Sequence, residues 1–267
     1  MNQEFITDLF GVENKVAIVT GGAGRLGFQH IGALRKAGAK VISFDVVKND
    51  ALETIAEQRI VDITNQSEVK RAVDEVVEKY GGVDILINNA AVNPKASSDD
   101  PDNLKMFGPY ENYPADLWNK EIAVGLSGAH YCIQAVAPYM MKKKEGSIIN
   151  VASTSAITAP QHAKYEKGKY KSAGYPTVKA ALLGLTRAWA SYFASTTPGI
   201  RVNTVSFGTV VFKQKSPEEL EKWASRNMLG RPANPSEYQG VIIFLCSKAS
   251  SFVNASNLVA DAGQTAW

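Results

Sequence analysis

The stretch TGGAGRLG, residues 20–27, decides the fold prediction. It follows a short run of β-branched residues, Val16 to Thr20, and it opens a segment with helical spacing. Gly22, Gly24 and Gly27 satisfy the pattern G-x-G-x-x-G. Glycine permits a tight turn and lets backbone N–H groups approach a pyrophosphate at a helix N-terminus, where the helix dipole favours anions. Strand, turn and helix in this order predict a dinucleotide-binding loop, although the pattern alone leaves a structural glycine-rich turn open.

Strands and helices are expected to alternate along the whole chain. Short β-branched runs predict seven buried strands, at Val16 to Thr20, Val41 to Val46, Arg59 to Ile63, Val83 to Asn88, Ser147 to Val151, Ile200 to Ser206 and Leu258 to Ala260. Helical spacing is found between them at Leu26 to Lys36, Gln66 to Tyr80, Ala115 to Met141, Tyr175 to Ser195 and Pro235 to Ser247. A parallel pair of strands needs a crossover connection. We therefore expect an α/β fold: one doubly wound Rossmann domain, with a parallel seven-stranded sheet and helices on both faces.

Three polar stretches interrupt this alternation, at about 93–113, 160–174 and 211–226. The first two follow predicted strands, so they leave from strand ends at which open α/β sheets bind ligands. We expect all three to line the mouth of the site. No repeat, linker or change in composition divides the chain, and residues 1–267 are expected to form a single domain.

The composition excludes several classes of protein. The chain has 267 residues, of which 45% are hydrophobic and 21% charged, as is typical of a globular protein. Its 29 Lys and Arg and 26 Asp and Glu leave a net charge of +3, and no block of like charges is longer than Lys142 to Lys144, so we expect no nucleic acid partner. The three histidines, His30, His130 and His162, lack metal-ligand spacing, so we expect no metal site.

The cysteines and the N-terminus suggest a location. Cys132 and Cys246 lie inside apolar, helix-like patterns, which favours buried thiols over a disulfide and hence a reducing compartment. The first residues, MNQEFITD, lack the basic start and apolar core of a signal peptide. No segment approaches the roughly 18 apolar residues of a membrane span. We expect a cytoplasmic protein that does not contact a membrane.

Asp45 indicates which dinucleotide is bound. It ends the second predicted strand, about 20 residues after the glycine loop, where a carboxylate accepts hydrogen bonds from a ribose 2′-OH and repels a 2′-phosphate. We therefore expect NAD, with NADP less favoured. The charge of Arg25 partly offsets that repulsion and counts against the preference, and a solvated loop carboxylate is the alternative for Asp45.

The motifs taken together resemble those of the short-chain dehydrogenase/reductase family, in order and spacing, over nearly the whole chain. The segments that carry the resemblance are the loop at 20–27, NNAA at 88–91, Ser153, Tyr175-x-x-x-Lys179, IRVN at 200–203, VSFG at 205–208 and ADAG at 260–263. The resemblance implies a catalytic set of Ser153, Tyr175 and Lys179. It also implies cofactor contacts from Thr20, Gly21, Gly22, Gly24, Arg25, Leu26, Gly27, Asp45, Asp62, Ile63, Asn88, Asn89, Ala90, Ala91, Tyr175, Lys179, Gly208 and Val210.

Three tyrosines stand four residues before a lysine, namely Tyr139, Tyr165 and Tyr175, so spacing alone does not choose between them. Tyr139 falls near the end of a predicted helix, before the strand that carries the serine. Tyr165 lies in the glycine- and lysine-rich insert. Tyr175 has Pro176 in what would be a first helical turn, and residues four apart on a helix share a face, which favours Tyr175 with Lys179.

The chemistry expected of this set couples hydride transfer to proton transfer. A phenol with a pKa of about 10 is a poor base near neutral pH and needs a neighbouring cation to favour phenolate. The resemblance implies that Lys179 supplies this charge and also binds the nicotinamide ribose. Ser153 is expected to donate a hydrogen bond to the reacting oxygen. A serine that only caps the local backbone is the alternative.

Three positions depart from the family pattern. Gly125 stands where the family normally has an asparagine that helps to hold a water behind the lysine, Phe207 replaces a proline, and Arg25 replaces a glycine. These departures motivate one hypothesis, a dinucleotide-binding regulatory protein with impaired turnover. The complete serine, tyrosine and lysine set favours the other hypothesis, an NAD(H)-dependent oxidoreductase that interconverts a secondary alcohol and a carbonyl.

The inserts suggest a small polar substrate such as a sugar, a polyol or a sugar acid. They carry Lys164, Lys167, Lys169, Lys171, Lys213 and Lys215, which favour hydroxylated or anionic compounds, although a solvated lysine-rich loop explains them equally well. The resemblance also implies a homotetramer, with an interface formed by the helices that start near Ala115 and Tyr175. Burial of their apolar faces against the sheet is the alternative.

Overall fold

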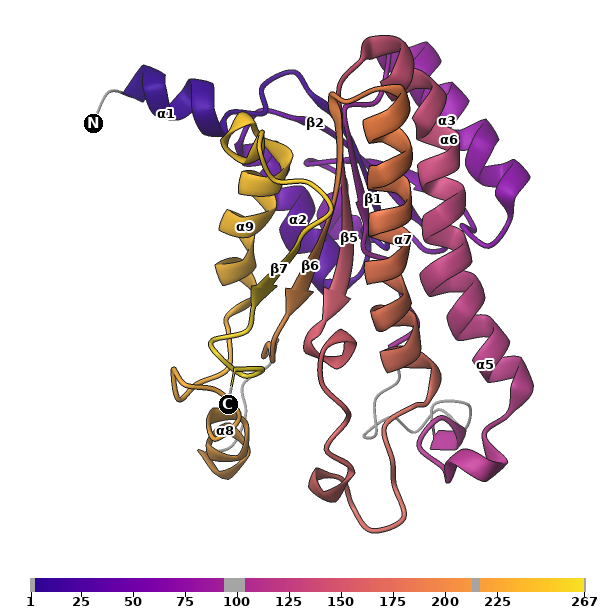
Figure 1. The fold of residues 1–267 in the computed structure, drawn as a ribbon, viewed down its shortest axis with the longest axis vertical. Helices are drawn as coiled ribbons and strands as arrows, with labels where there is room; N and C mark the ends of the chain where they lie inside the picture. The colour runs from indigo at the N-terminus through magenta and orange to yellow at the C-terminus, as the bar shows by residue number, and fades with distance from the viewer. Residues whose placement is uncertain (1–2, 94–103, 213–216, 267) are drawn as a thin grey trace.

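The computed structural model describes residues 3–93, 104–212 and 217–266 (Figure 1). Seven parallel strands form one sheet in the order β3-β2-β1-β4-β5-β6-β7. Their bounds are β1 Val16–Thr20, β2 Lys40–Asp45, β3 Glu57–Ile60, β4 Ile85–Asn88, β5 Gly146–Ser153, β6 Ile200–Phe207 and β7 Asn257–Ala260. The doubly wound Rossmann fold predicted from the sequence is confirmed.

Helices cover both faces of the sheet (Figure 1). On one face lie α3 (Gln66–Tyr80), α6 (Gly128–Lys143) and α7 (Gly174–Thr196), and on the other lie α2 (Arg25–Lys36) and α9 (Gln239–Cys246). Successive side chains of a strand point to opposite faces. Val16 and Ile18 of β1 accordingly pack in the core under α3 and α6, while Ala17 and Val19 pack in the core under α2 and α9. β1 is therefore buried on both faces and apolar without alternation from Val16 to Val19.

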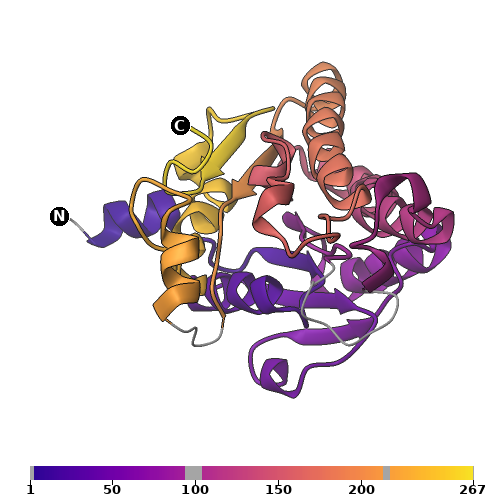
Figure 2. The same ribbon diagram turned by 90° about the horizontal axis from the view of Figure 1, so that it is seen from below.

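The order of the strands reverses beside β1, which pairs with β2 on one side and with β4 on the other. The register aligns Val19 with Ile87 and Asn88 with Asn150, so β1, β4 and β5 end at the same edge. Open α/β sheets bind ligands at this kind of switch point. Figure 2 shows the molecule from this edge, onto which the glycine loop and the insert at 160–174 open.

The structure differs from the sequence prediction mainly at the ends of elements. β3 spans 57–60 instead of 59–63, because this stretch pairs with 42–45 of β2 and the pairing stops where β2 ends. The helix predicted over 115–141 is found, with a π-helical interruption that was not predicted. It consists of α5 (Ala115–Ile122), a π-helical segment (Ala123–Ser127) and α6. One wide turn changes the apolar periodicity too little to be detected in the sequence.

Two short helices were not predicted, α1 (Gln3–Phe10) and α8 (Pro217–Ala224). Of the predicted inserts, residues 94–103 and 213–216, with Lys213 and Lys215, lie outside the described residues. The stretch 160–174 extends beyond the strand ends before it enters α7 (Figure 1). All described strands belong to one sheet, and the single-domain organisation of 1–267 stays a prediction.

Cys132 and Cys246 are buried free thiols, as predicted, and burial raises the pKa of each to about 12. Among the described helices, none has the length and apolar character needed to cross a membrane.

Candidate active site

The glycine loop after β1 is shaped by close backbone approaches. Gly21 has a φ of 64°, and a Cβ there would lie 2.8 Å from the Cα of Ala90. A Cβ on Gly22 would lie 2.2 Å from the Ser43 hydroxyl oxygen, and one on Gly27 would lie 2.2 Å from the carbonyl oxygen of Gly21. Gly22 therefore lets the loop lie against β2, and Gly27 lets α2 start against the loop. A larger side chain at any of these positions would push the loop apart.

Thr20 and Asn89 join the loop to the end of β4. The Thr20 hydroxyl accepts hydrogen bonds from the backbone N–H groups of Asn89 and Ala90, at 3.0 and 3.1 Å. The Asn89 amide donates to the carbonyls of Thr20 and Gly21, at 3.0 and 3.1 Å. Asn88 points away from this edge, and its amide donates to Asn150 Oδ1 at 2.9 Å inside the core. The hydrogen bonds of Thr20 and Asn89 therefore fix the loop against the end of β4.

Asp45 lies where the sequence predicted it, at the end of β2 and beside the loop. Its Oδ2 accepts a hydrogen bond from the N–H of Ala23 at 3.0 Å, and its Oδ1 accepts one from the N–H of Val46 at 2.8 Å. Arg25, the first residue of α2, points elsewhere, with its guanidinium carbon 5.3 Å from the centre of the Phe212 ring. The carboxylate is thus held beside the loop, and the Arg25 charge lies over an aromatic ring.

The remaining predicted cofactor residues lie after β3, β4 and β6 and at the start of α2. Asp62 is exposed and accepts hydrogen bonds from the N–H and hydroxyl of Thr64, at 2.9 and 2.8 Å, whereas the side chain of Ile63 is buried in the core. Leu26 packs partly buried beneath the loop, Gly24 precedes α2 as its N-cap, and Ala91 follows Ala90 after β4.

The chain after β6 approaches β7 and the segment before α9. A Cβ on Gly208 would lie 2.7 Å from the Cα of Asp261. A parallel bridge pairs Val210 with Ala233, but its two hydrogen bonds use the carbonyl of Thr209 and the N–H of Val211. The N–H and the carbonyl of Val210 are therefore not used by the bridge.

The three predicted catalytic residues converge at this edge. Ser153 is the last residue of β5, and its hydroxyl accepts a hydrogen bond from the Ser155 N–H at 3.2 Å. It also lies near enough to the Tyr175 side chain to lower the pKa of that phenol. Tyr175 and Lys179 lie one turn apart near the start of α7, and the Lys179 Nζ is 5.7 Å from the centre of the Tyr175 ring. The Lys179 ammonium donates to the carbonyl of Val151 at 2.6 Å and is almost fully buried.

Burial controls the proton affinities of this set. It raises the pKa of Tyr175, and the nearby Ser153 hydroxyl opposes that rise. It also lowers the pKa of Lys179 to about 8, because a buried ammonium loses its hydration. Near neutral pH the phenol therefore holds its proton and the lysine beside it is charged.

The other two tyrosines with the same spacing lie elsewhere. The hydroxyl of Tyr139 donates to Asp74 at 2.6 Å, between α6 and α3. Tyr165 lies in the insert, with its ring centre 5.9 Å from that of Phe107. Of the three, Tyr175 is the tyrosine that the structure brings together with Ser153 and Lys179.

A buried carboxylate that the sequence analysis missed lies below this set. Glu121 of α5 accepts hydrogen bonds from the hydroxyls of Tyr113, at 2.6 Å, and Ser172. Ser172 in turn accepts one from the backbone N–H of Tyr175 at 3.0 Å, and a Cβ on Gly174 would meet the Glu121 carboxylate. The group orders the start of α7, since a negative charge is stabilised at a helix N-terminus. The signal available in the sequence was an acidic residue inside an apolar helical pattern.

The space beside Gly125 is filled by Val178, the residue before Lys179. Gly125 is buried in the π-helical segment, and a Cβ there would lie 2.4 Å from Val178 Cγ1. An asparagine does not fit at this position without movement of Val178. Val178 of the facing helix α7 thus occupies the space that a side chain at position 125 would need.

Phe207, the second departure, has a packing role. Its ring stacks on that of Tyr238, with centres 4.1 Å apart, and lies 5.8 Å from the ring of His30 on α2. His30 is fully buried, neither ring nitrogen has a hydrogen-bond partner within the described residues, and burial lowers its pKa to about 3. These three rings join β6 to α2 and to the turn before α9.

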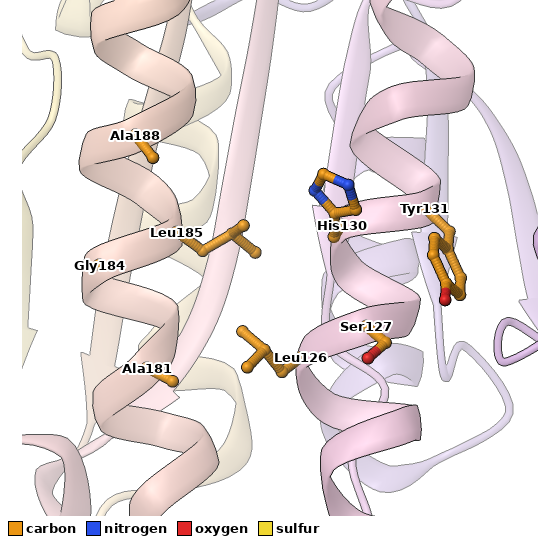
Figure 3. A pocket seen from close by; sticks show the side chains of 8 residues that line it. All are labelled: Leu126, Ser127, His130, Tyr131, Ala181, Gly184, Leu185 and Ala188. Carbon is orange, nitrogen blue, oxygen red and sulfur yellow. The ribbon is translucent and has the colours of Figure 1, made fainter.

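An apolar groove runs between α6 and α7, away from the catalytic set (Figure 3). It is lined by Leu126, Ser127, His130, Tyr131, Ala181, Gly184, Leu185 and Ala188. None of these residues belongs to the predicted site.

Comparison with known proteins decides the family. A family model described as Enoyl-(Acyl carrier protein) reductase matches residues 25–265. The chain belongs to the short-chain dehydrogenase/reductase family. This short-chain dehydrogenase/reductase is 32% identical over 264 residues to the 3-oxoacyl-(acyl-carrier-protein) reductase FabG of Thermotoga maritima, an alignment that covers 94% of this chain and 98% of the relative. It is therefore an oxidoreductase that acts on alcohol or carbonyl groups.

Two solved structures share the fold over nearly their full length. One is a gluconate 5-dehydrogenase from Burkholderia cenocepacia in complex with NADP and tartrate, with a TM-score of 0.83, 26% identity, and coverage of 98% of this chain and 99% of that chain. The other is a short chain dehydrogenase from Leptospira borgpetersenii with bound NAD+, with a TM-score of 0.84, 28% identity, and coverage of 99% and 97%.

Proposed function

We propose that this protein interconverts a secondary alcohol and a carbonyl on a small polar substrate, with NAD(H) as cofactor and Tyr175 as the acid/base. The observation that carries the proposal is the convergence of Ser153, Tyr175 and Lys179 at the edge where the loop 20–27 follows β1. Two independent strands and one helix bring these groups together. One structural relative is a gluconate 5-dehydrogenase, which supports a sugar-like substrate.

In this mechanism each residue of the set has a separate role. Tyr175 takes the hydroxyl proton during oxidation and returns it to the carbonyl oxygen during reduction. Ser153 donates a hydrogen bond that holds the reacting oxygen beside the phenol. The Lys179 ammonium favours the phenolate, because an adjacent cation stabilises the charged form. Lys179 is itself held by the carbonyl of Val151.

The described residues fit a dinucleotide. Gly21, Gly22 and Gly27 place no side chains between the backbone of the loop and a ligand at the start of α2. The N–H and the carbonyl of Val210 are not used by its bridge to Ala233. A bound nicotinamide dinucleotide supplies the hydride acceptor for oxidation or the hydride donor for reduction. Asp45 is held beside the loop by the N–H groups of Ala23 and Val46. Its carboxylate would accept a hydrogen bond from a ribose hydroxyl and repel a 2′-phosphate. We therefore propose NAD in preference to NADP.

An absorbance assay at 340 nm tests the proposal. The purified protein is offered NADH or NADPH with a panel of ketoses, keto acids and cyclic ketones, and NAD or NADP with the corresponding alcohols. We expect turnover of at least one polar substrate, faster with NADH than with NADPH, and loss of that turnover in Ser153→Ala. Silence across the panel, with NADH still bound, would favour the alternative, a dinucleotide-binding regulatory protein.

We also propose that the chain forms a homotetramer through the groove between α6 and α7. The groove presents Leu126, Ala181 and Leu185 to the exterior, with Gly184 and Ala188 exposed on α7. Exposed apolar surface of this kind is typical of an interface. Sedimentation of the wild type should give a tetramer, and Ala188→Arg should shift it to smaller species because a charge would be buried without a partner. A wild-type monomer would contradict this proposal.

A further inference from the structure

Lys171 is a cation at the active edge that the mechanism above does not use. Its Nζ lies 4.3 Å from the centre of the Tyr175 ring, closer than the Nζ of Lys179 at 5.7 Å. The Nζ donates to the neutral Oδ1 of Asn93 at 3.2 Å. Lys171 therefore presents a positive charge to the face of the tyrosine that is proposed to exchange a proton with the substrate.

The insert holds Lys171 in this place. Its backbone N–H donates to Nδ1 of His162 at 3.3 Å, and the N–H of Tyr170 donates to the carbonyl of Phe107 at 2.8 Å. The Nζ of Lys171 also lies 6.0 Å from the centre of the Phe107 ring. Hydrogen bonds from its own N–H and from that of Tyr170, together with contacts with two rings, distinguish it from a lysine on a solvated loop.

Arg226 is a second cation at the other end of the same group of aromatic side chains. Its guanidinium carbon lies 4.4 Å from the centre of the Trp223 ring, and its Nε is buried with no hydrogen-bond partner in the described part of the chain. Burial raises the pKa of Tyr165, and the Arg226 guanidinium opposes that rise. The Tyr165 ring packs on Phe107, the ring that Lys171 also faces. Lys171 and Arg226 thus flank one row of rings.

Neither charge is well compensated by the residues that the structure describes. Burial lowers the pKa of Lys171 to about 8, and it lowers the pKa of Arg226. Glu121 is the carboxylate whose charge raises the pKa of Lys171, and it is already hydrogen-bonded by Tyr113 and Ser172. A buried charge without a full set of partners is costly, and an anionic ligand would remove that cost.

We propose that Lys171 binds an anionic group of the substrate and that the charge of Arg226, at the other end of the row of rings, favours the same anion, so that the enzyme acts on a polyhydroxy compound that carries a carboxylate or a phosphate near the reacting carbon. The two side chains suit this task in different ways. Lysine is a compact point charge that tolerates several directions of approach, whereas the planar guanidinium of arginine binds two oxygens at once. The inference rests on the proposed function, because Tyr175 marks where the reacting carbon lies.

Matched substrates test this assignment. D-gluconate, D-sorbitol and D-sorbitol 6-phosphate share a polyol chain and differ in the anionic group, so kcat/KM is measured for each with NAD. In Lys171→Gln we expect kcat/KM for the preferred anionic compound to fall by about 10- to 100-fold, the value of a charged hydrogen bond, while that for sorbitol changes by less than about threefold. Arg226→Gln should act in the same direction. Lys171→Arg should retain most of the activity.

The control is Lys169→Gln, which removes a lysine of the same insert that is paired with Glu166 at 2.8 Å. It should leave all three substrates unaffected. A preference for gluconate identifies a carboxylate, and a preference for the phosphate ester identifies a phosphate. An equal loss for the anionic and the neutral substrate in Lys171→Gln would overturn the proposal, since the lysine would then support Tyr175 or Glu121.

A binding arm keeps the proposal testable if none of these substrates turns over. Tartrate, threitol and inorganic phosphate are titrated calorimetrically into the enzyme saturated with NADH. We expect tartrate or phosphate to bind, threitol to bind more weakly, and Lys171→Gln to remove the difference. No anion binding by the wild type, or equal binding by the variant, would overturn the anion site. Anion binding without turnover would count against the proposed substrate alone.

Discussion

The loop at 20–27 and the insert at 160–174 lie at the same edge of the sheet but are specified in different ways. In the loop the missing side chains matter, because added Cβ atoms at Gly22 and Gly27 would meet other atoms at 2.2 Å. In the insert the side chains themselves matter, through His162 and Lys171. We propose that the cofactor is bound by backbone geometry and that the substrate is selected by side-chain chemistry. Changes in the first region should therefore abolish binding of any dinucleotide, and changes in the second should alter substrate choice.

Gly27→Val should give the largest effect in this comparison. The new side chain would collide with the backbone oxygen of Gly21, which cannot rotate away. We expect the affinity for NADH to fall by at least about 100-fold, or about 3 kcal/mol, as measured by NADH fluorescence.

The matched control for Gly27→Val lies one and a half turns further along α2. A Cβ on Gly32 would meet no atom within 4 Å, so Gly32→Ala should leave NADH affinity unchanged and increase stability slightly. Unchanged NADH binding in Gly27→Val would show that the loop does not bind the dinucleotide.

Gly125→Asn should destabilise the fold, because its side chain needs the space that Val178 occupies. Valine is stiff about χ1, so the cost should reach about 3 kcal/mol of unfolding free energy, at the upper end for overpacking. Affinity for the dinucleotide should change little in the folded fraction. Chemical denaturation and NADH titration measure the two quantities.

The double variant Gly125→Asn/Val178→Ala sharpens this test. Removing the valine methyl groups should recover part of the lost stability, so the two substitutions should be strongly non-additive. If the two losses of stability simply add, the side chains at positions 125 and 178 do not compete for the same space.

His30 predicts how stability depends on pH, and its effect is smaller. Its pKa is lowered from 6.5 to about 3 in the folded protein by burial, so the unfolded chain binds more protons between these values. The free energy of unfolding is thus unaffected by this group above pH 6.5 and falls as the pH drops below it. The loss from pH 6.5 to 5 should be about 2 kcal/mol.

His30→Leu removes the titrating ring and keeps an apolar side chain of similar size. Denaturation curves at several pH values should show a flatter acid slope for the variant than for the wild type. Parallel slopes would mean that His30 does not remain neutral in the folded protein.

Much of the loop at 20–27 and its surroundings was predictable from the sequence, for a physical reason. Glycines at fixed spacing after a strand, followed by Asp45 at the next strand end, are local patterns, and the structure places them as expected. A strand is found at each of the seven predicted places, because most of these strands are buried apolar runs. β3 is the exception, since it is polar and only partly buried. Strand ends were shifted, since pairing with a neighbour decides where an edge strand stops.

The insert at 160–174 and the residues that pack around the start of α7 were less predictable, because their contacts join segments that are distant in sequence. The sequence singled out Lys171 only as one of several lysines, and its approach to Tyr175 and Asn93 depends on the folded insert. Glu121 was missed, since its partners Tyr113 and Ser172 come from separate segments. Gly125 was recognised as a departure, but its matching residue, Val178, lies on another helix.

The measurement that tests the central claim most directly is the rate of hydride transfer in Tyr175→Phe, followed at 340 nm in a single turnover with the substrate found in the panel. Phenylalanine keeps the ring and removes the proton-transfer group, so NADH affinity should be retained. We predict a rate lower than that of the wild type by a factor of about a hundred or more, the usual contribution of a general acid or base. Hydride transfer at the wild-type rate would contradict the account.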